Sequence, residues 1–244
     1  MIRRQSTMSL AERTRCRIVI VGDSGCGKSS LLSLFVKESF PEVYIPTTFE
    51  QYESTIDVGK MHLEVNIWDT SGKSEYDNVR HLAYPDTTAS IICYDVSRPD
   101  TLKSVIEKWQ PEILRYCSNS PIILAGCKND LRNNVQILSE LGTMRKIPVS
   151  HERGTKVARQ IGAAAFVECS AKTNLLSVRE VFENAALASI GKLSLQKSYM
   201  DLPSMGRKLS IRQSFRRRKD GFRSPVRVKT TVVKADKGKM CVVM

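Results

Sequence analysis

Residues 22–29 read GDSGCGKS and fit the pattern G-x-x-x-x-G-K-[S/T] between a strand-like run and a helical run. Glycines in this pattern let backbone N–H groups close around a phosphate at a helix start, where those donors otherwise lack partners. We expect the Lys28 ammonium to reach the β- and γ-phosphates of a nucleotide and the Ser29 hydroxyl to bind Mg²⁺. A glycine-rich turn without a ligand is the alternative, and the strand–turn–helix context disfavours it.

Two further oxygen-bearing residues stand where a magnesium site could use them. Asp69 ends an apolar run in the sequence DTSG (69–72), as an aspartate that holds Mg²⁺ through water would. Thr47 lies in YIPTTFEQY (44–52), before a predicted hairpin, where it could sense the terminal phosphate through the metal. We therefore predict a magnesium site formed by Ser29, Thr47 and Asp69.

Two short motifs, CKND (127–130) and CSAK (169–172), each follow a predicted strand and indicate a base-binding site. The Asp130 carboxylate can accept both hydrogen bonds from the guanine N1–H and 2-amino group, which adenine cannot supply. Each motif is weak alone, but the ordered set predicts GTP and Mg²⁺ as ligands. An ATP-dependent P-loop kinase is disfavoured by Asp130 and by the lack of a motif for an acceptor substrate.

Alternation of short β-branched runs with helical patterns from residue 16 to 190 predicts an α/β domain that positions these motifs. We expect a doubly wound, mostly parallel six-stranded sheet with one antiparallel edge strand and the nucleotide at the C-terminal strand ends. The expected strands are 16–22, 51–58, 61–68, 89–96, 121–127 and 164–169, and the expected helices are 31–36, 100–116, 151–161 and 175–189.

Composition divides the 244 residues into three parts: a flexible extension (1–15), the α/β domain (16–190) with an insert (131–149), and a basic disordered tail (191–244). The 41% hydrophobic content suffices for a core, and no apolar run reaches the ~20 residues of a spanning helix. With no secretory signal evident, we expect a cytosolic protein. Most of the seven cysteines lie in apolar runs and are expected to be reduced core thiols without zinc spacing.

The formal net charge of +13 belongs mainly to the tail, where residues 207–240 hold thirteen Lys/Arg and two Asp. The chain ends in CVVM, which fits a C-a-a-X signal and predicts farnesylation of Cys241 rather than a buried terminal cysteine. Because one isoprenoid binds a membrane only weakly, the basic run would supply the second signal, attraction to anionic lipid. Nucleic acid is the rival partner, but only Phe215 and Phe222 could stack on bases and no nucleic-acid motif is present.

Three serines follow basic residues and could be kinase targets: Ser6, Ser210 and Ser214. Phosphates on the two tail serines would weaken the attraction to anionic lipid and act as an electrostatic switch. Unmodified, solvated serines are the open alternative.

Residues 16–190 resemble a small GTPase of the Ras superfamily, and the segments 40–52, 68–80 and 131–149 resemble the Rho family. Within that family, DTSG, GCKND, SRPDTLKSV (97–105) and the basic extension before CVVM resemble the Rnd (RhoE-like) branch. The resemblance selects Thr47 over Thr48 as the metal ligand, because the family ligand directly follows the proline of Y-x-P-T-x-F.

The resemblance implies a P-loop small-GTPase fold and a residue-by-residue assignment of the site. The phosphate-binding residues would be Gly22, Asp23, Ser24, Gly25, Cys26, Gly27, Lys28, Ser29 and Gly72. The guanine-binding residues would be Phe40, Cys127, Lys128, Asp130, Ser170, Ala171 and Lys172. Effectors would contact two switch segments, switch I (44–52) and switch II (71–82), through Tyr44, Pro46, Thr47, Thr48, Phe49, Glu50, Tyr52 and Tyr76.

Three residues depart from the hydrolytic pattern of the family, at places where the Rnd branch also departs. Lys73 replaces a glutamine that orients the attacking water, and an ammonium offers three donors and no acceptor. Ser24 replaces a glycine that leaves room for an arginine finger, and Ser71 replaces a smaller alanine. Without an arginine finger and a water-orienting group, hydrolysis should fall below ~10⁻⁴ s⁻¹. Cys127 also replaces an asparagine, and its thiol is a weaker hydrogen-bond partner, so one contact that ties the base to neighbouring loops should be weakened.

The expected function is that of a monomeric GTP-binding protein that hydrolyses GTP very slowly or not at all and remains GTP-bound. No hydrolytic residue set is intact, so we do not expect an efficient enzyme. The resemblance implies attachment to the cytoplasmic face of the plasma membrane, with a cytosolic pool, and effectors that oppose Rho signalling and alter the actin cytoskeleton. A conventional cycling GTPase that tolerates Lys73 is the alternative.

Overall fold

The structure is a computed structural model, and it describes residues 14–43, 46–58 and 61–193. In chain order the elements are β1 (Thr14–Gly22), α1 (Lys28–Lys37), β2 (Phe49–Val58), β3 (Met61–Thr70), η1 (Ser74–Tyr76), α2 (Asp77–Arg80), η2 (His81–Ala83), β4 (Ala89–Asp95), α3 (Pro99–Ser104), η3 (Val105–Trp109), α4 (Gln110–Tyr116), β5 (Ile122–Cys127), η4 (Asn129–Leu131), α5 (Val135–Thr143), α6 (His151–Gln160), β6 (Ala165–Glu168) and α7 (Leu175–Ser189). Each expected strand and helix is present, with ends that shift by a few residues.

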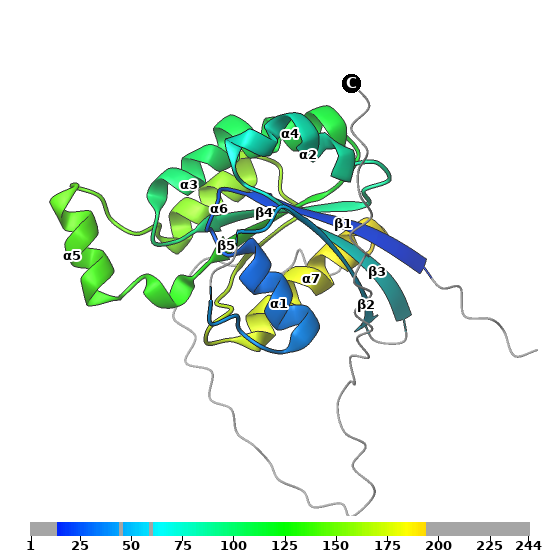
Figure 1. Ribbon diagram of the computed structural model, residues 1–244, viewed down its shortest axis with the longest axis horizontal. Helices are drawn as coiled ribbons and strands as arrows, with labels where there is room; N and C mark the ends of the chain where they lie inside the picture. Colours follow the sequence, from blue (N-terminus) through cyan, green and yellow to red (C-terminus); the bar gives the residue numbers. More distant parts are fainter. Residues whose placement is uncertain (1–13, 44–45, 59–60, 194–244) are drawn as a thin grey trace, which may run out of the picture.

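The six strands form one sheet in the order β2-β3-β1-β4-β5-β6. The β2 strand pairs antiparallel with β3 at one edge, and the other pairs are parallel. Helices α1 and α7 lie on one face of the sheet, and α3, α4 and α6 lie on the other (Figure 1). This arrangement confirms the predicted sheet, including its single antiparallel edge strand.

The two faces of the sheet divide the core, and β1 shows how the sequence achieves this. Ile18 and Ile20 pack in the cluster beneath α1 and α7, whereas Val19 and Val21 pack in the cluster on the opposite face. Because successive strand side chains point to opposite faces, a strand covered on both sides must be continuously apolar. The strand ends at Gly22, where the polar phosphate loop (residues 22–29) begins.

The helix predicted over 100–116 contains a wider turn than a regular α-helix. Its middle, Val105–Trp109, is a π-helical segment in which the Gln110 N–H donates to the Val105 carbonyl, five residues back. Pro111 has no N–H to donate, so a regular α-helical ladder would lose a hydrogen bond near this point. The wide turn lies directly before this proline.

The predicted insert (131–149) contains one helix, α5, which stands apart from the sheet (Figure 1). The Asn134 side chain accepts hydrogen bonds from the backbone N–H groups of Gln136 and Ile137, which caps the helix start. Within residues 14–43, 46–58 and 61–193, no helix has both the length and the apolarity needed to cross a bilayer.

Candidate functional site

The phosphate loop joins β1 to α1 and confirms the strand–turn–helix context of the motif. Gly22 and Gly27 have φ values of 145° and 109°, which side-chain-bearing residues rarely adopt. The buried Lys28 ammonium donates to the carbonyl oxygens of Gly22 (2.7 Å) and Asp23 (2.9 Å). This cation therefore lies inside the loop, where the phosphates of a nucleotide are expected.

The three predicted magnesium ligands converge from three separate elements. The Ser29 hydroxyl on α1 lies 2.6 Å from the Thr47 hydroxyl and donates to the Asp69 carboxylate at 2.5 Å. The second Asp69 oxygen, Oδ1, is buried without a hydrogen-bond partner among the described residues. An all-oxygen donor set with an unpartnered carboxylate oxygen fits a hard cation such as Mg²⁺. Thr48 is exposed, so the choice of Thr47 is consistent with the structure.

Burial raises the pKa of Asp69 to about 6, while the Ser29 hydrogen bond and the Lys28 charge act in the opposite direction. A buried carboxylate is costly unless a positive charge compensates it. The electrostatics of Asp69 therefore favour a bound cation.

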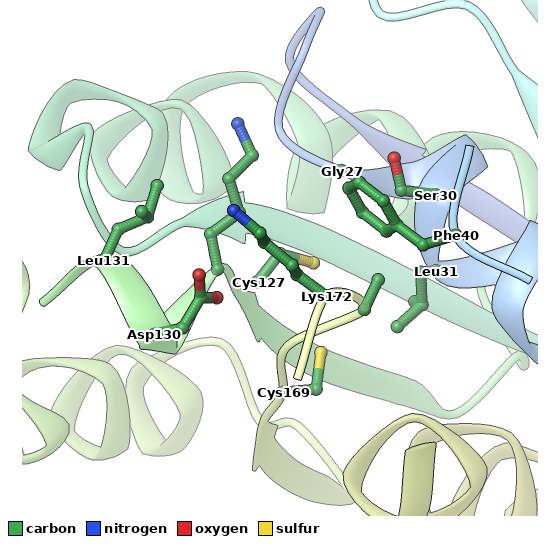
Figure 2. A pocket seen from close by; sticks show the side chains of 11 residues that line it. Gly27, Ser30, Leu31, Phe40, Cys127, Asp130, Leu131, Cys169 and Lys172 are labelled. Carbon is green, nitrogen blue, oxygen red and sulfur yellow. The ribbon is translucent and has the colours of Figure 1, made fainter. Parts of the chain in front are cut away.

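A pocket of about 200 Å³ lies between the phosphate loop and the loops that follow β5 and β6 (Figure 2). Asp130 and Phe40 lie on opposite sides of it, and the Phe40 side chain is 43% exposed, which leaves its ring free to stack on a base. The lining residues are Gly27, Ser30, Leu31, Phe40, Cys127, Lys128, Asp130, Leu131, Cys169, Ala171 and Lys172. The predicted base-binding residues thus meet in one place, with Ser170 as the exception.

Ser170 supports the pocket from behind rather than lining it. Its side chain is fully buried, and the hydroxyl oxygen accepts hydrogen bonds from the backbone N–H groups of Lys172 (3.2 Å) and Thr173 (3.1 Å). The sequence placed Ser170 among the base-binding residues because of its position in CSAK. In the structure this hydroxyl fixes the loop that presents Ala171 and Lys172, and a contact between Ser170 and the base stays a prediction.

Cys127 lies in the floor of the pocket and is buried among other thiols. Hydrogen bonds from the thiols of Cys169 and Cys93 hold the pKa of Cys127 well below its usual value. The Cys127 side chain also lies against Gly27 of the phosphate loop, where an added Cβ would be 3.3 Å from the Cys127 Cβ. All six cysteines that the structure describes are buried free thiols, as predicted for this part of the chain.

A salt-bridge network that the sequence analysis missed joins the base pocket to the phosphate loop. The Lys128 ammonium donates to the Gly25 carbonyl (2.7 Å) and to the buried Asp95 carboxylate (2.8 Å). Arg98 also pairs with Asp95 (3.0 Å) and donates to the Ser24 carbonyl (3.0 Å). Burial opposes ionisation of Asp95, but Lys128, Ser97 and Arg98 together lower its pKa. The sequence shows an aspartate at the end of the apolar strand β4, but it does not show that Lys128 binds it.

The residues of the predicted hydrolytic defect lie together beside the phosphate loop. A Cβ added at Gly72 would lie 2.3 Å from the Gly22 carbonyl oxygen, so only glycine fits this approach. Ser71 is buried, and its hydroxyl accepts from the Lys73 backbone N–H at 3.4 Å. The Lys73 side chain is exposed.

The two switch segments touch through aromatic rings. Phe49 and Tyr76 form an edge-to-face pair with ring centroids 6.0 Å apart. In switch I, the Tyr52 hydroxyl donates to the exposed Glu50 carboxylate, and Pro46 is also exposed. Tyr44 lies outside the described residues, as do Ser6, Ser210, Ser214 and Cys241, so their roles remain predictions.

Comparisons with known proteins agree with this geometry. The profile of the Ras family matches residues 17–190. The chain is 43% identical over 240 residues to the Rho-related GTP-binding protein RhoE of Homo sapiens, which covers 98% of this chain and 95% of that protein. It is 49% identical over 183 residues to the GTP-binding protein rho1 of Schizosaccharomyces pombe, which covers 75% of this chain and 90% of that protein.

Proposed function

Because this chain belongs to the Ras family, as a Rho-related GTP-binding protein close to the Rnd branch, we propose that it binds GTP with Mg²⁺ and retains the triphosphate. In this function the protein hydrolyses GTP very slowly or not at all. Its control would come from abundance, location and modification rather than from a hydrolytic cycle.

The observation that supports slow hydrolysis most strongly is Lys73, directly after the glycine that packs on the phosphate loop. GTP hydrolysis depends on orienting a water and stabilising the charge that spreads over the phosphates. An ammonium cannot accept a hydrogen bond from that water. The Lys73 side chain is exposed and could instead reach toward the terminal phosphate, where its charge would favour bound GTP.

The remaining residues of the site support binding. Lys28 and the N–H groups at the start of α1 would hold the phosphates, and Ser29, Thr47 and Asp69 would hold Mg²⁺, with Asp69 acting through water. Bound Mg²⁺ supplies positive charge that neutralises the phosphate oxygens. Asp130 would select guanine, with Phe40 stacked on the base.

We further propose that the protein acts at the cytoplasmic face of the plasma membrane, with a cytosolic pool. A farnesyl group on Cys241 would anchor it weakly, and the basic tail would add about 1 kcal/mol per cation near an anionic leaflet. The switch segments would present a lasting GTP-bound surface to effectors that act on the actin cytoskeleton and oppose Rho signalling. A Cys241→Ser variant should move to the cytosol, and unchanged membrane partition would contradict this part of the proposal.

The nucleotide on freshly purified protein tests the proposal most directly. We expect GTP after denaturation and chromatography of the released nucleotide. Recovery of GDP would favour the alternative, a conventional cycling GTPase that tolerates Lys73.

A restoration experiment tests the cause. The triple variant Ser24→Gly, Ser71→Ala, Lys73→Gln should hydrolyse labelled GTP in single turnover at least about a hundredfold faster than the native chain, because it regains the acceptor and the space around it. Lys103→Gln, at an exposed position of α3, is the matched control and should leave the hydrolysis rate unchanged. Native hydrolysis as fast as that of the triple variant would defeat the proposal.

A further inference from the structure

Arg80, at the end of α2, is a fully buried arginine whose five N–H donors all have acceptors. Nε donates to the Ser71 carbonyl (2.9 Å), and one terminal nitrogen donates to the Lys73 carbonyl (3.1 Å) and to Asp77 (2.5 Å). The other terminal nitrogen binds both Glu112 oxygens, at 3.0 and 2.9 Å. Removing such a residue would leave several buried acceptors without partners.

The two carbonyls that Arg80 binds flank Gly72. Gly72 itself packs against the phosphate loop so closely that an added Cβ would lie 2.5 Å from the Ser24 nitrogen. Arg80 therefore fixes the Ser71–Gly72 peptide unit, which carries the N–H of the glycine that is expected to bind the terminal phosphate, and also the Lys73–Ser74 peptide unit that follows. A glycine presents only its backbone to an anion, so the orientation of these peptides determines whether its N–H can bind phosphate.

The residues that hold Arg80 lie on the η3–α4 helix, and one of them also contacts the phosphate loop. Its guanidinium lies 4.7 Å from the ring centroid of buried Trp109, and the indole N–H of Trp109 donates to the Asp23 carboxylate at 2.7 Å. Glu112 also accepts from the Tyr84 hydroxyl. The network thus joins switch II, the η3–α4 helix and the phosphate loop through protein contacts alone.

The charges around Arg80 are arranged to keep it ionised and in place. Burial acts to lower the Arg80 pKa, but hydrogen bonds to Asp77 and Glu112 outweigh burial and raise it. The Lys108 ammonium binds the Asp77 carboxylate at 2.9 Å and so holds one Arg80 acceptor in position. Hydrogen bonds between a guanidinium and a carboxylate are charge-assisted, and they are about twice as strong as those between neutral groups.

We propose that Arg80 is a positioning residue that holds Gly72 in its phosphate-binding orientation before the terminal phosphate arrives. The inference deepens the proposed function, since it rests on GTP binding at this site. With Gly72 already in place, GTP does not have to order switch II when it binds. The protein would thereby favour GTP over GDP, which lacks the phosphate that Gly72 contacts.

The ratio of GTP to GDP affinity tests this role. An Arg80→Lys variant keeps the charge but cannot bind both carbonyls and Glu112 together. We expect it to lower the affinity for a non-hydrolysable GTP analogue about tenfold and to change the GDP affinity less than twofold. Arg17→Lys is the matched control, because Arg17 also stacks on a tryptophan and donates to a carbonyl, that of Ala83, but does not contact residues 71–77. It should leave the ratio unchanged.

If the Arg80→Lys protein fails to fold, hydrogen–deuterium exchange on a second, milder variant still tests the inference. Glu112→Gln should speed exchange of the amides in 71–77 in the GDP-bound protein, and bound GTP analogue should restore their protection. Equal losses of GTP and GDP affinity in Arg80→Lys, or native exchange rates in Glu112→Gln, would overturn the inference. Single-turnover hydrolysis is measured in parallel and should stay slow in each variant. Fast hydrolysis by the native chain would contradict the proposed function. The ratio of GTP to GDP affinity would still test the role of Arg80.

Discussion

The guanine end and the terminal-phosphate end of the nucleotide site are built by different means. At the guanine end, side chains from several elements line a pocket, and Asp130 is expected to supply the acceptors that distinguish guanine. At the phosphate end, backbone groups, one buried lysine and a close-packed glycine form the surface. Binding at the phosphate end therefore depends on main-chain geometry, which tolerates exchanges such as Ser71 and Lys73. In the proposed function, hydrolysis depends on one water-orienting side chain and should be lost with these exchanges.

The largest expected effect comes from removing the buried cation at the phosphate end of the site. A Lys28→Met variant removes a buried cation that would contact two phosphates, so the affinity for GTP and GDP should fall about a thousandfold. Titration with fluorescent nucleotide measures this loss. Lys37→Met, at the exposed end of the same helix, should bind normally. A loss below tenfold in Lys28→Met would show that the backbone suffices for phosphate binding.

The next largest effect should come from the guanine end. Asp130→Asn replaces an acceptor-only carboxylate by an amide, so GTP affinity should fall about a hundredfold. Inosine triphosphate lacks the 2-amino group, so the variant should discriminate GTP from this analogue less well than the native chain does. Competition binding compares the two nucleotides, with the exposed Asp100→Asn as control. Undiminished discrimination would mean that another group recognises the 2-amino position.

Acidity should weaken the predicted metal site, which belongs to the phosphate end. The pKa of Asp69 rises from 3.8 to about 6 on folding, so between these values the folded chain holds a proton that the unfolded chain has released. Raising the pH through this window lowers the free energy of unfolding of the metal-free protein. Mg²⁺ must displace the same proton, so its affinity should fall up to about tenfold per pH unit below 6. Magnesium titrations of nucleotide release at pH 5 to 7 measure this, and Asp69→Asn should abolish the dependence.

The smallest expected effect comes from a substitution that should strengthen nucleotide binding at the guanine end of the site. Cys127→Asn replaces a thiol by an amide that can bridge the pocket and the phosphate loop, and should slow nucleotide release about fivefold, or ~1 kcal/mol. Stopped-flow dissociation of labelled GDP measures the change, with Cys117→Ser as a control away from the pocket. Release as fast as in the native chain would show that Lys128 and Asp95 already provide the connection.

Contiguous motifs made most of the site predictable. The phosphate loop, the Asp69 and Thr47 ligands and the Asp130 pocket were all assigned from local patterns, and the structure brings them together. The alternating apolar strands likewise predicted the sheet. These features depend on neighbours in the sequence, so their types and spacing carry the information.

The residues that the sequence did not reveal depend on distant partners. Asp95 is one of several aspartates until Lys128, 33 residues later, is seen to meet it. Arg80 looks like an ordinary charged residue of a short helix, and its burial results from Glu112 and Trp109, about thirty residues later. Pairings across such separations leave no local pattern in a single chain.

The wide turn at Val105–Trp109 also determines how many residues the surrounding helix needs to place its buried side chains. Four positions spaced four residues apart are buried: Val105, Trp109, Ile113 and Cys117. In a regular helix of 3.6 residues per turn, side chains with this spacing would shift progressively around the helix axis. If the same residues formed a regular α-helical turn instead of this wide one, everything downstream would be rotated by about 100° and Glu112 would turn away from Arg80. The number of residues in this helix therefore matters to the site as much as their identity does. A scan of point substitutions alone would not detect this dependence on length.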